Sequence, residues 1–153
     1  MSNLKDWIAR QLGMAPGDPA SADPNQALNL AVAALLFEIL RADYEVAVGE
    51  REAVIAAVGR LLNLTAQASE ALVADAEREI DKSHDLYQFT SLVNRSYSDA
   101  DKLQLLEQLW RVAMADEVVH KYEEHLIRRI ADLLYVPHAG FIAAKLRAAA
   151  ERP

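Results

Sequence analysis

The sequence LFEILRADYEVAVGE at residues 36–50 returns in altered form at residues 109–123, as LWRVAMADEVVHKYE. Aligned without a gap, the two stretches share their apolar positions and place Asp43 on Asp116, an offset of 73 residues. Beyond the loop an offset of 72 residues fits better, because one copy of the loop carries an extra residue. Each copy has the pattern of an apolar helix ending in Ala-Asp, a loop, and a helix with an acidic start. The repeat predicts a duplicated helix-loop-helix unit.

The most apolar stretch of the chain, residues 27–40, leads into the first copy. It is shorter than the roughly 20 residues that span a bilayer, and it contains Asn29 and Glu38. We therefore predict no transmembrane segment here, but a helix buried on most of its circumference at the centre of the domain. Asp23 and Pro24 mark its start, because Asp caps free helix amides and Pro fits the first turn.

Helical spacing of apolar residues continues through the rest of the chain. Thr65 is the predicted cap of one further helix, and Ser98 with Asp101 forms a capping-box pattern at another. No segment alternates apolar and polar residues over a useful length, so strands are not expected. We predict an all-α fold, a compact bundle of seven to eight helices with an internal pseudo-twofold helix-loop-helix duplication. Residues 25–153 are predicted to form this domain.

Residues 1–24 have a different pattern. Apolar residues recur at helical spacing near the start and predict a short amphipathic helix: Leu4, Trp7, Ile8 and Leu12. Residues 13–23 carry two glycines and two prolines, which is the composition of a linker. The first residues lack the apolar core and the small-residue cleavage site of a signal peptide, so we expect a cytoplasmic protein.

Composition excludes several classes of function. The net charge is −7 and no basic cluster compensates locally, which argues against binding of nucleic acid. The chain has no cysteine, so thiol catalysis, disulfides and cysteine-ligated metal sites are excluded. No glycine-rich phosphate loop and no Gly-x-Ser-x-Gly motif is present. We predict that the protein is not an enzyme.

At the repeated residues the sequence resembles the TerB-like family, the helical domain associated with tellurite resistance, and within it the stand-alone bacterial branch. The family repeats Ala-Asp-Gly before a Glu-rich helix start. The first copy matches this with Ala42-Asp43 and Glu50-Arg51-Glu52. The second copy matches it with Ala115-Asp116 and Glu123-Glu124. The resemblance covers roughly residues 27–149.

The resemblance implies a compact bundle with pseudo-twofold symmetry and divalent-metal binding by the acidic loops. Tyr44 and Glu117 stand where the family has glycine, which would permit a positive φ angle and a tight loop. The resemblance implies no reaction.

Six acidic side chains of the two copies are the candidate metal ligands. Hard divalent cations such as Ca²⁺ and Mg²⁺ prefer clustered carboxylate and carbonyl oxygens. If the two loops meet at the pseudo-twofold axis, one ion is held by residues from both copies: Asp43, Glu50, Glu52, Asp116, Glu123 and Glu124. The alternative is that the glutamates stabilise helix starts through the helix dipole, while the two aspartates anchor the loops.

Two functional hypotheses follow. In the first, the chain is a non-catalytic module of the TerB-like family that binds a divalent metal through the duplicated acidic loops in a stress or metal response. In the second, the same bundle is a protein–protein interaction or scaffold domain without metal, and an unidentified protein is its partner. The sequence leaves the oligomeric state open.

Overall fold

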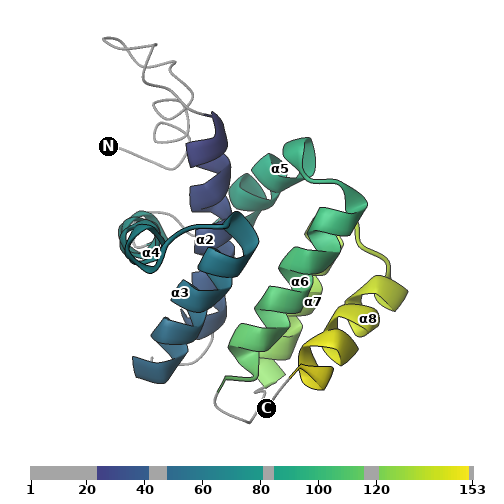
Figure 1. Ribbon diagram of the computed structural model, residues 1–153. Helices are drawn as coiled ribbons and strands as arrows, with labels where there is room; N and C mark the ends of the chain where they lie inside the picture. Colours follow the sequence, from purple (N-terminus) through teal and green to yellow (C-terminus); the bar gives the residue numbers. More distant parts are fainter. Residues whose placement is uncertain (1–23, 42–47, 81–84, 116–120, 152–153) are drawn as a thin grey trace.

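The computed structural model describes residues 24–41, 48–80, 85–115 and 121–151 (Figure 1). The predicted N-terminal helix and the linker that follows it lie outside the described residues. No helix among the described residues has the length and apolar character that crossing a membrane requires.

Every described element is an α-helix, and the described residues contain no strand, which confirms the all-α prediction (Figure 1). The helices are α2 (Pro24–Arg41), α3 (Val48–Leu62), α4 (Ala66–Ile80), α5 (Leu86–Ser96), α6 (Asp99–Ala113), α7 (Lys121–Leu133) and α8 (His138–Ala150).

Helix α2 is the centre of the bundle, as its sequence predicts. All side chains of residues 30–37 are buried, and Glu38 is only partly exposed. Helices α3, α4, α5, α6 and α7 all pack against α2. A helix that is apolar around its whole circumference needs partners on every side, and these five helices supply them.

Local side-chain signals set several helix starts. The Thr65 hydroxyl accepts the N–H of Ala68 at 3.1 Å and caps α4. Ser98 and Asp101 form a reciprocal capping box at the start of α6, with donor–acceptor distances of 3.1 and 3.3 Å. Each bond satisfies an amide that has no partner within the helix. The predicted caps at Thr65 and Ser98 are confirmed, and the predicted cap Asp23 lies outside the described residues.

The helices of the two copies pack in corresponding ways. Helix α3 returns along α2, and α7 returns along α6; α4 then packs on α2, and α8 packs on α6 (Figure 1). The copies also meet each other, because α3 packs against α6 and α7 packs against α2. A twofold rotation that exchanges the copies converts the α3–α6 pair into the α7–α2 pair, so the presence of both pairs agrees with pseudo-twofold symmetry. One difference is that α4 packs closely against α3, whereas α8 has few contacts with α7.

The duplication extends beyond the units that the sequence revealed. At the end of α3 the N–H of Leu64 donates to the carbonyl of Gly59, with an N···O distance of 3.2 Å. At the end of α7 the N–H of Val136 donates to the carbonyl of Ala131, with an N···O distance of 2.9 Å. Both residues of this pair lie 72 positions after their counterparts, so the hydrogen bond itself is repeated.

The residue before each of these donors has a left-handed backbone. Asn63 has a φ angle of 54° and Tyr135 has a φ angle of 61°. A left-handed residue followed by a hydrogen bond to the preceding turn is a common way to end a helix. The same backbone turn therefore leads into α4 and α8, although the side chains of the two turns differ.

Candidate functional site

The predicted ligands flank the two loops that lie within the repeat. Figure 1 shows that α2 and α6 end, and α3 and α7 begin, at the same end of the bundle. Two of the six predicted ligands, Asp43 and Asp116, lie outside the described residues. The other four are described, and they fall into two groups.

Glu50 and Glu123 form the first group and occupy equivalent positions in the two copies. Glu50 lies in the first turn of α3, and Glu123 lies in the first turn of α7. Their exposed fractions are 8% and 4%, so both residues are buried. A buried carboxylate needs hydrogen bonds or a cation to replace its lost hydration.

Glu52 and Glu124 form the second group. Glu52 is exposed and lies past the first turn of α3, because that helix already begins at Val48. Capping through the helix dipole, which the sequence predicted for Glu52, is therefore wrong, since the effect falls off within the first turn. Glu124 lies in the first turn of α7, with its carboxylate 3.9 Å from the ammonium group of Lys145 on α8. Glu52 and Glu124 are therefore more exposed to solvent than Glu50 and Glu123.

The described part of the chain does not by itself complete a metal site. Among the described residues, no group of three or more His, Asp or Glu side chains is close enough to hold one ion. A site that contains Glu50 and Glu123 would therefore need further oxygen ligands from water or from residues outside the described part of the chain.

Trp110 connects this end of the bundle to α8. Its ring is fully buried and lies 5.2 Å from the ring of Phe141, measured between centroids. The ammonium group of Lys145 lies 5.1 Å from the centroid of the same indole ring. Lys145 thus lies near both the Trp110 ring and the carboxylate of Glu124.

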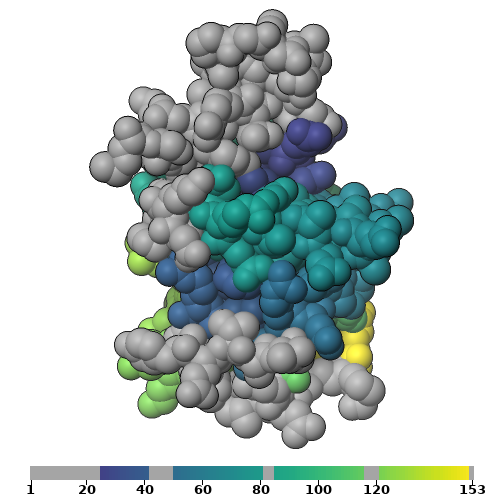
Figure 2. All heavy atoms as spheres, turned by 90° about the vertical axis from the view of Figure 1, so that its left-hand side faces the viewer, coloured from purple at the N-terminus to yellow at the C-terminus, as the bar shows by residue number. Residues whose placement is uncertain are grey.

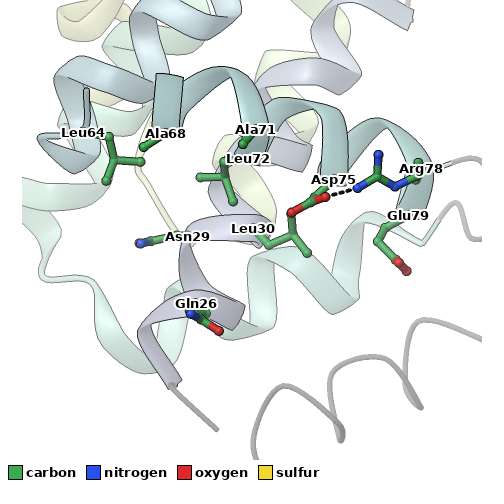
Figure 3. A pocket seen from close by; sticks show the side chains of 10 residues that line it. All are labelled: Gln26, Asn29, Leu30, Leu64, Ala68, Ala71, Leu72, Asp75, Arg78 and Glu79. Carbon is green, nitrogen blue, oxygen red and sulfur yellow. Dashed lines mark hydrogen bonds and ion pairs between the residues drawn. The ribbon is translucent and has the colours of Figure 1, made fainter. Parts of the chain in front are cut away.

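A groove that the sequence did not predict lies between α2 and α4 (Figure 3). Its volume is about 540 Å³. Its wall on α2 comes from the first turns of that helix, and its other wall comes from α4 and the turn before it. The residues that line it are Gln26, Asn29, Leu30, Leu64, Ala68, Ala71, Leu72, Asp75, Arg78 and Glu79.

The lining of the groove is mixed, because leucine and alanine side chains stand beside amide and charged side chains. Leu30, Leu64 and Leu72 project into it, and Asp75 pairs with Arg78 at one end (Figure 3). Helical spacing predicts that Leu30 and Leu72 are core residues. It does not predict how the side chains of two helices pack together, so it does not predict the groove.

Comparison with known proteins places the fold and the repeat in a family. Residues 29–146 match the tellurite resistance protein TerB family, and the match runs from within α2 to within α8. No curated protein and no solved structure matches the chain. Because the match covers most of the chain, and includes both helix-loop-helix copies, the protein belongs to the TerB family.

Proposed function

We propose that the protein is a non-catalytic TerB module that binds one divalent cation, Ca²⁺ or Mg²⁺, where α3 and α7 begin. The observation that supports this proposal is the burial of Glu50 and Glu123 at equivalent positions of the two copies. Two buried glutamates at the same end of the bundle supply the hard oxygen ligands that these ions prefer. Asp43 and Asp116 are the further ligands in this proposal. Its cellular context is a stress or metal response.

The proposal assigns different weights to the four described glutamates. Glu50 and Glu123 hold the ion directly. Glu52 is exposed, and Glu124 is paired with Lys145, so neither is needed for binding. The six ligands that the sequence predicted are thereby reduced to four: Asp43, Glu50, Asp116 and Glu123.

Thermal melting with and without millimolar Ca²⁺ or Mg²⁺ tests the proposal. An ion that binds only the folded state at 100 times its Kd adds about 2.7 kcal/mol of stability. We expect a higher melting temperature with metal, and we expect Asp43→Asn combined with Asp116→Asn to remove most of the increase. Glu50→Gln combined with Glu123→Gln should do the same.

The matched control is Glu52→Gln, which changes an exposed glutamate of the same helix and should leave the metal-dependent increase intact. Calorimetric titration provides a second readout that does not depend on the stability of the variants. If titration with millimolar metal shows no binding to the unmodified chain, the carboxylates serve the fold alone. The interaction or scaffold hypothesis then stands in its place.

A further inference from the structure

The groove between α2 and α4, called here the α2–α4 groove, has a closed counterpart in the second copy. Gly140 of α8 corresponds to Ala68 of α4 at the offset of 72 residues. A Cβ atom on Gly140 would lie 2.9 Å from Leu103 Cδ2 and 2.9 Å from Val136 Cγ1. Helix α8 therefore packs closely at this position, and a side chain on residue 140 would require Leu103 and Val136 to move.

The residues that close the second copy correspond to residues that line the groove in the first. Leu103 corresponds to Leu30, and Val136 corresponds to Leu64. In the first copy these two leucines and Ala68 face an open groove of about 540 Å³. Side chains around Gly140 fill this position in the second copy, whereas the first copy has an open groove beside Ala68, although α4 packs on α2 as extensively as α8 packs on α6.

We propose that residues 4–12 of the same chain bind in the α2–α4 groove as an amphipathic helix. Their apolar side chains lie on one helical face, which suits the three leucines of the groove: Leu4, Trp7, Ile8 and Leu12. The polar side chains that flank this face suit the polar lining of the groove. This is helix-in-groove recognition, in which residues at spacings of three, four and eight anchor the ligand. A nine-residue helix is about 14 Å long.

The position of the groove favours this segment over a separate molecule. Gln26 and Asn29 line the groove within the first two turns of α2, close to where residues 13–23 join that helix. Eleven linker residues extend to at most about 40 Å, which is ample for the return to α4. A short flexible tether gives an effective concentration on the order of millimolar, so a free competitor must exceed that concentration or bind more tightly.

The charges of the segment and the groove edge also agree. Asp75 and Glu79 place two carboxylates at one end of the groove, and Arg78 supplies one positive charge there (Figure 3). The segment carries Lys5 and Arg10 against a single aspartate. The net charges of the segment and of the groove edge are therefore opposite in sign. The resulting attraction is weak and mainly orients the segment.

Disulfide trapping in the full chain tests the proposal, and the natural chain has no cysteine to interfere. Ile8→Cys combined with Ala71→Cys puts one thiol on the apolar face of the segment and one on the groove wall. Under oxidised glutathione we expect a cross-link within one chain. Ala71 is exposed, so this substitution does not disturb the core.

Two matched pairs serve as controls. Ile8→Cys with Ala143→Cys uses the exposed counterpart of Ala71 on α8, where the groove is closed, and should not cross-link. Asp6→Cys with Ala71→Cys uses the opposite face of the segment and should cross-link less. Equal cross-linking of all three pairs would mean random encounter of the segment with the surface and would overturn the proposal.

Fluorescence of Trp7 gives an independent readout, since Trp110→Phe leaves it as the single tryptophan. We expect emission shifted to short wavelength and protection from acrylamide, both of which Ala71→Arg should abolish. Emission typical of a solvated indole in the unmodified groove would overturn the proposal. Cross-links found only between two chains would overturn the proposal and indicate that the groove binds residues 4–12 of a second copy. A solvent-exposed Trp7 without any cross-link would also overturn it and indicate that the groove binds a different protein.

Discussion

Trp110 is the largest of the fully buried side chains, and its neighbours include Phe141 and Lys145 of α8. In the repeat Trp110 aligns with Phe37, and both residues are buried. The partners of Trp110 were not predictable, because they come from α8, outside the repeat that was visible in the sequence. Contacts between distant segments depend on how helices cross, which spacing along one helix does not contain.

We expect Trp110→Ala to lower the free energy of unfolding by about 3–5 kcal/mol, because it leaves a large cavity in a packed site. Urea denaturation followed by circular dichroism measures the change. Trp110→Phe should cost less, since an aromatic ring remains against Phe141. A loss of less than about 1 kcal/mol for the alanine variant would show that the site collapses around the missing ring.

Tyr97 makes stability depend on pH at the alkaline end. Burial raises the pKa of its hydroxyl, and the negative charge of Asp101 raises the pKa further. The folded state therefore favours the protonated, neutral phenol. Its contribution is present below the ordinary tyrosine pKa of 10.0 and is lost as the pH rises through the higher pKa of the folded state.

We expect the free energy of unfolding to fall as the pH rises above about 10, and Tyr97→Phe to reduce that fall. Urea denaturation over this pH range measures the effect. The control is Tyr122→Phe, because Tyr122 is 75% exposed and its hydroxyl is hydrated in both states. Identical pH dependence of both variants would contradict the assignment to Tyr97.

At the scale of single elements, helix starts were easier to predict than the turns between helices. Thr65 and Ser98 mark their helices through side chains that bond the first amides, and such signals are local. The turn shared by Asn63 and Tyr135 was missed, because its backbone is the same while its side chains are not. A backbone hydrogen bond needs no particular side chain. The structure of this turn is therefore the same in both copies, although the two sequences differ.

This shared turn permits a matched pair of substitutions. A left-handed backbone costs a bulky residue roughly 1–2 kcal/mol, whereas Gly adopts it freely and Asn tolerates it. We expect Tyr135→Gly to stabilise the protein by about 0.5–1 kcal/mol, because Tyr135 is 77% exposed and little packing is lost. Asn63→Gly should change stability by less than about 0.5 kcal/mol. A destabilised Tyr135→Gly variant would show that the ring, which lies 6.0 Å from the Lys102 ammonium, matters more than the backbone.

At the scale of the whole molecule, the sequence predicted the fold class, the central helix and the end of the bundle that carries the acidic residues. It did not predict which glutamates are buried. Glu50 and Glu52 are two positions apart, yet one is buried and the other is exposed. The α2–α4 groove could not be predicted either, because it depends on how side chains from separate helices pack around Ala68 and Gly140.

The shared core predicts a single unfolding transition. Helix α2 packs against helices of both copies, so neither copy retains its core when the other unfolds. In a Trp7→Phe background, we expect the fluorescence of Trp110 and the far-ultraviolet circular dichroism to change at the same urea concentration. Two separate midpoints would show that the copies are independent folding units.

The burial of α2 on all sides has a consequence for synthesis on the ribosome. Residues 24–41 emerge early, yet the helices that cover them continue as far as Leu133. At 5–20 residues per second, the apolar surface of α2 waits roughly 5–20 s for its last neighbour. During that time the nascent chain presents a binding segment for cellular chaperones, and its yield in cells should depend on them more than its final stability suggests.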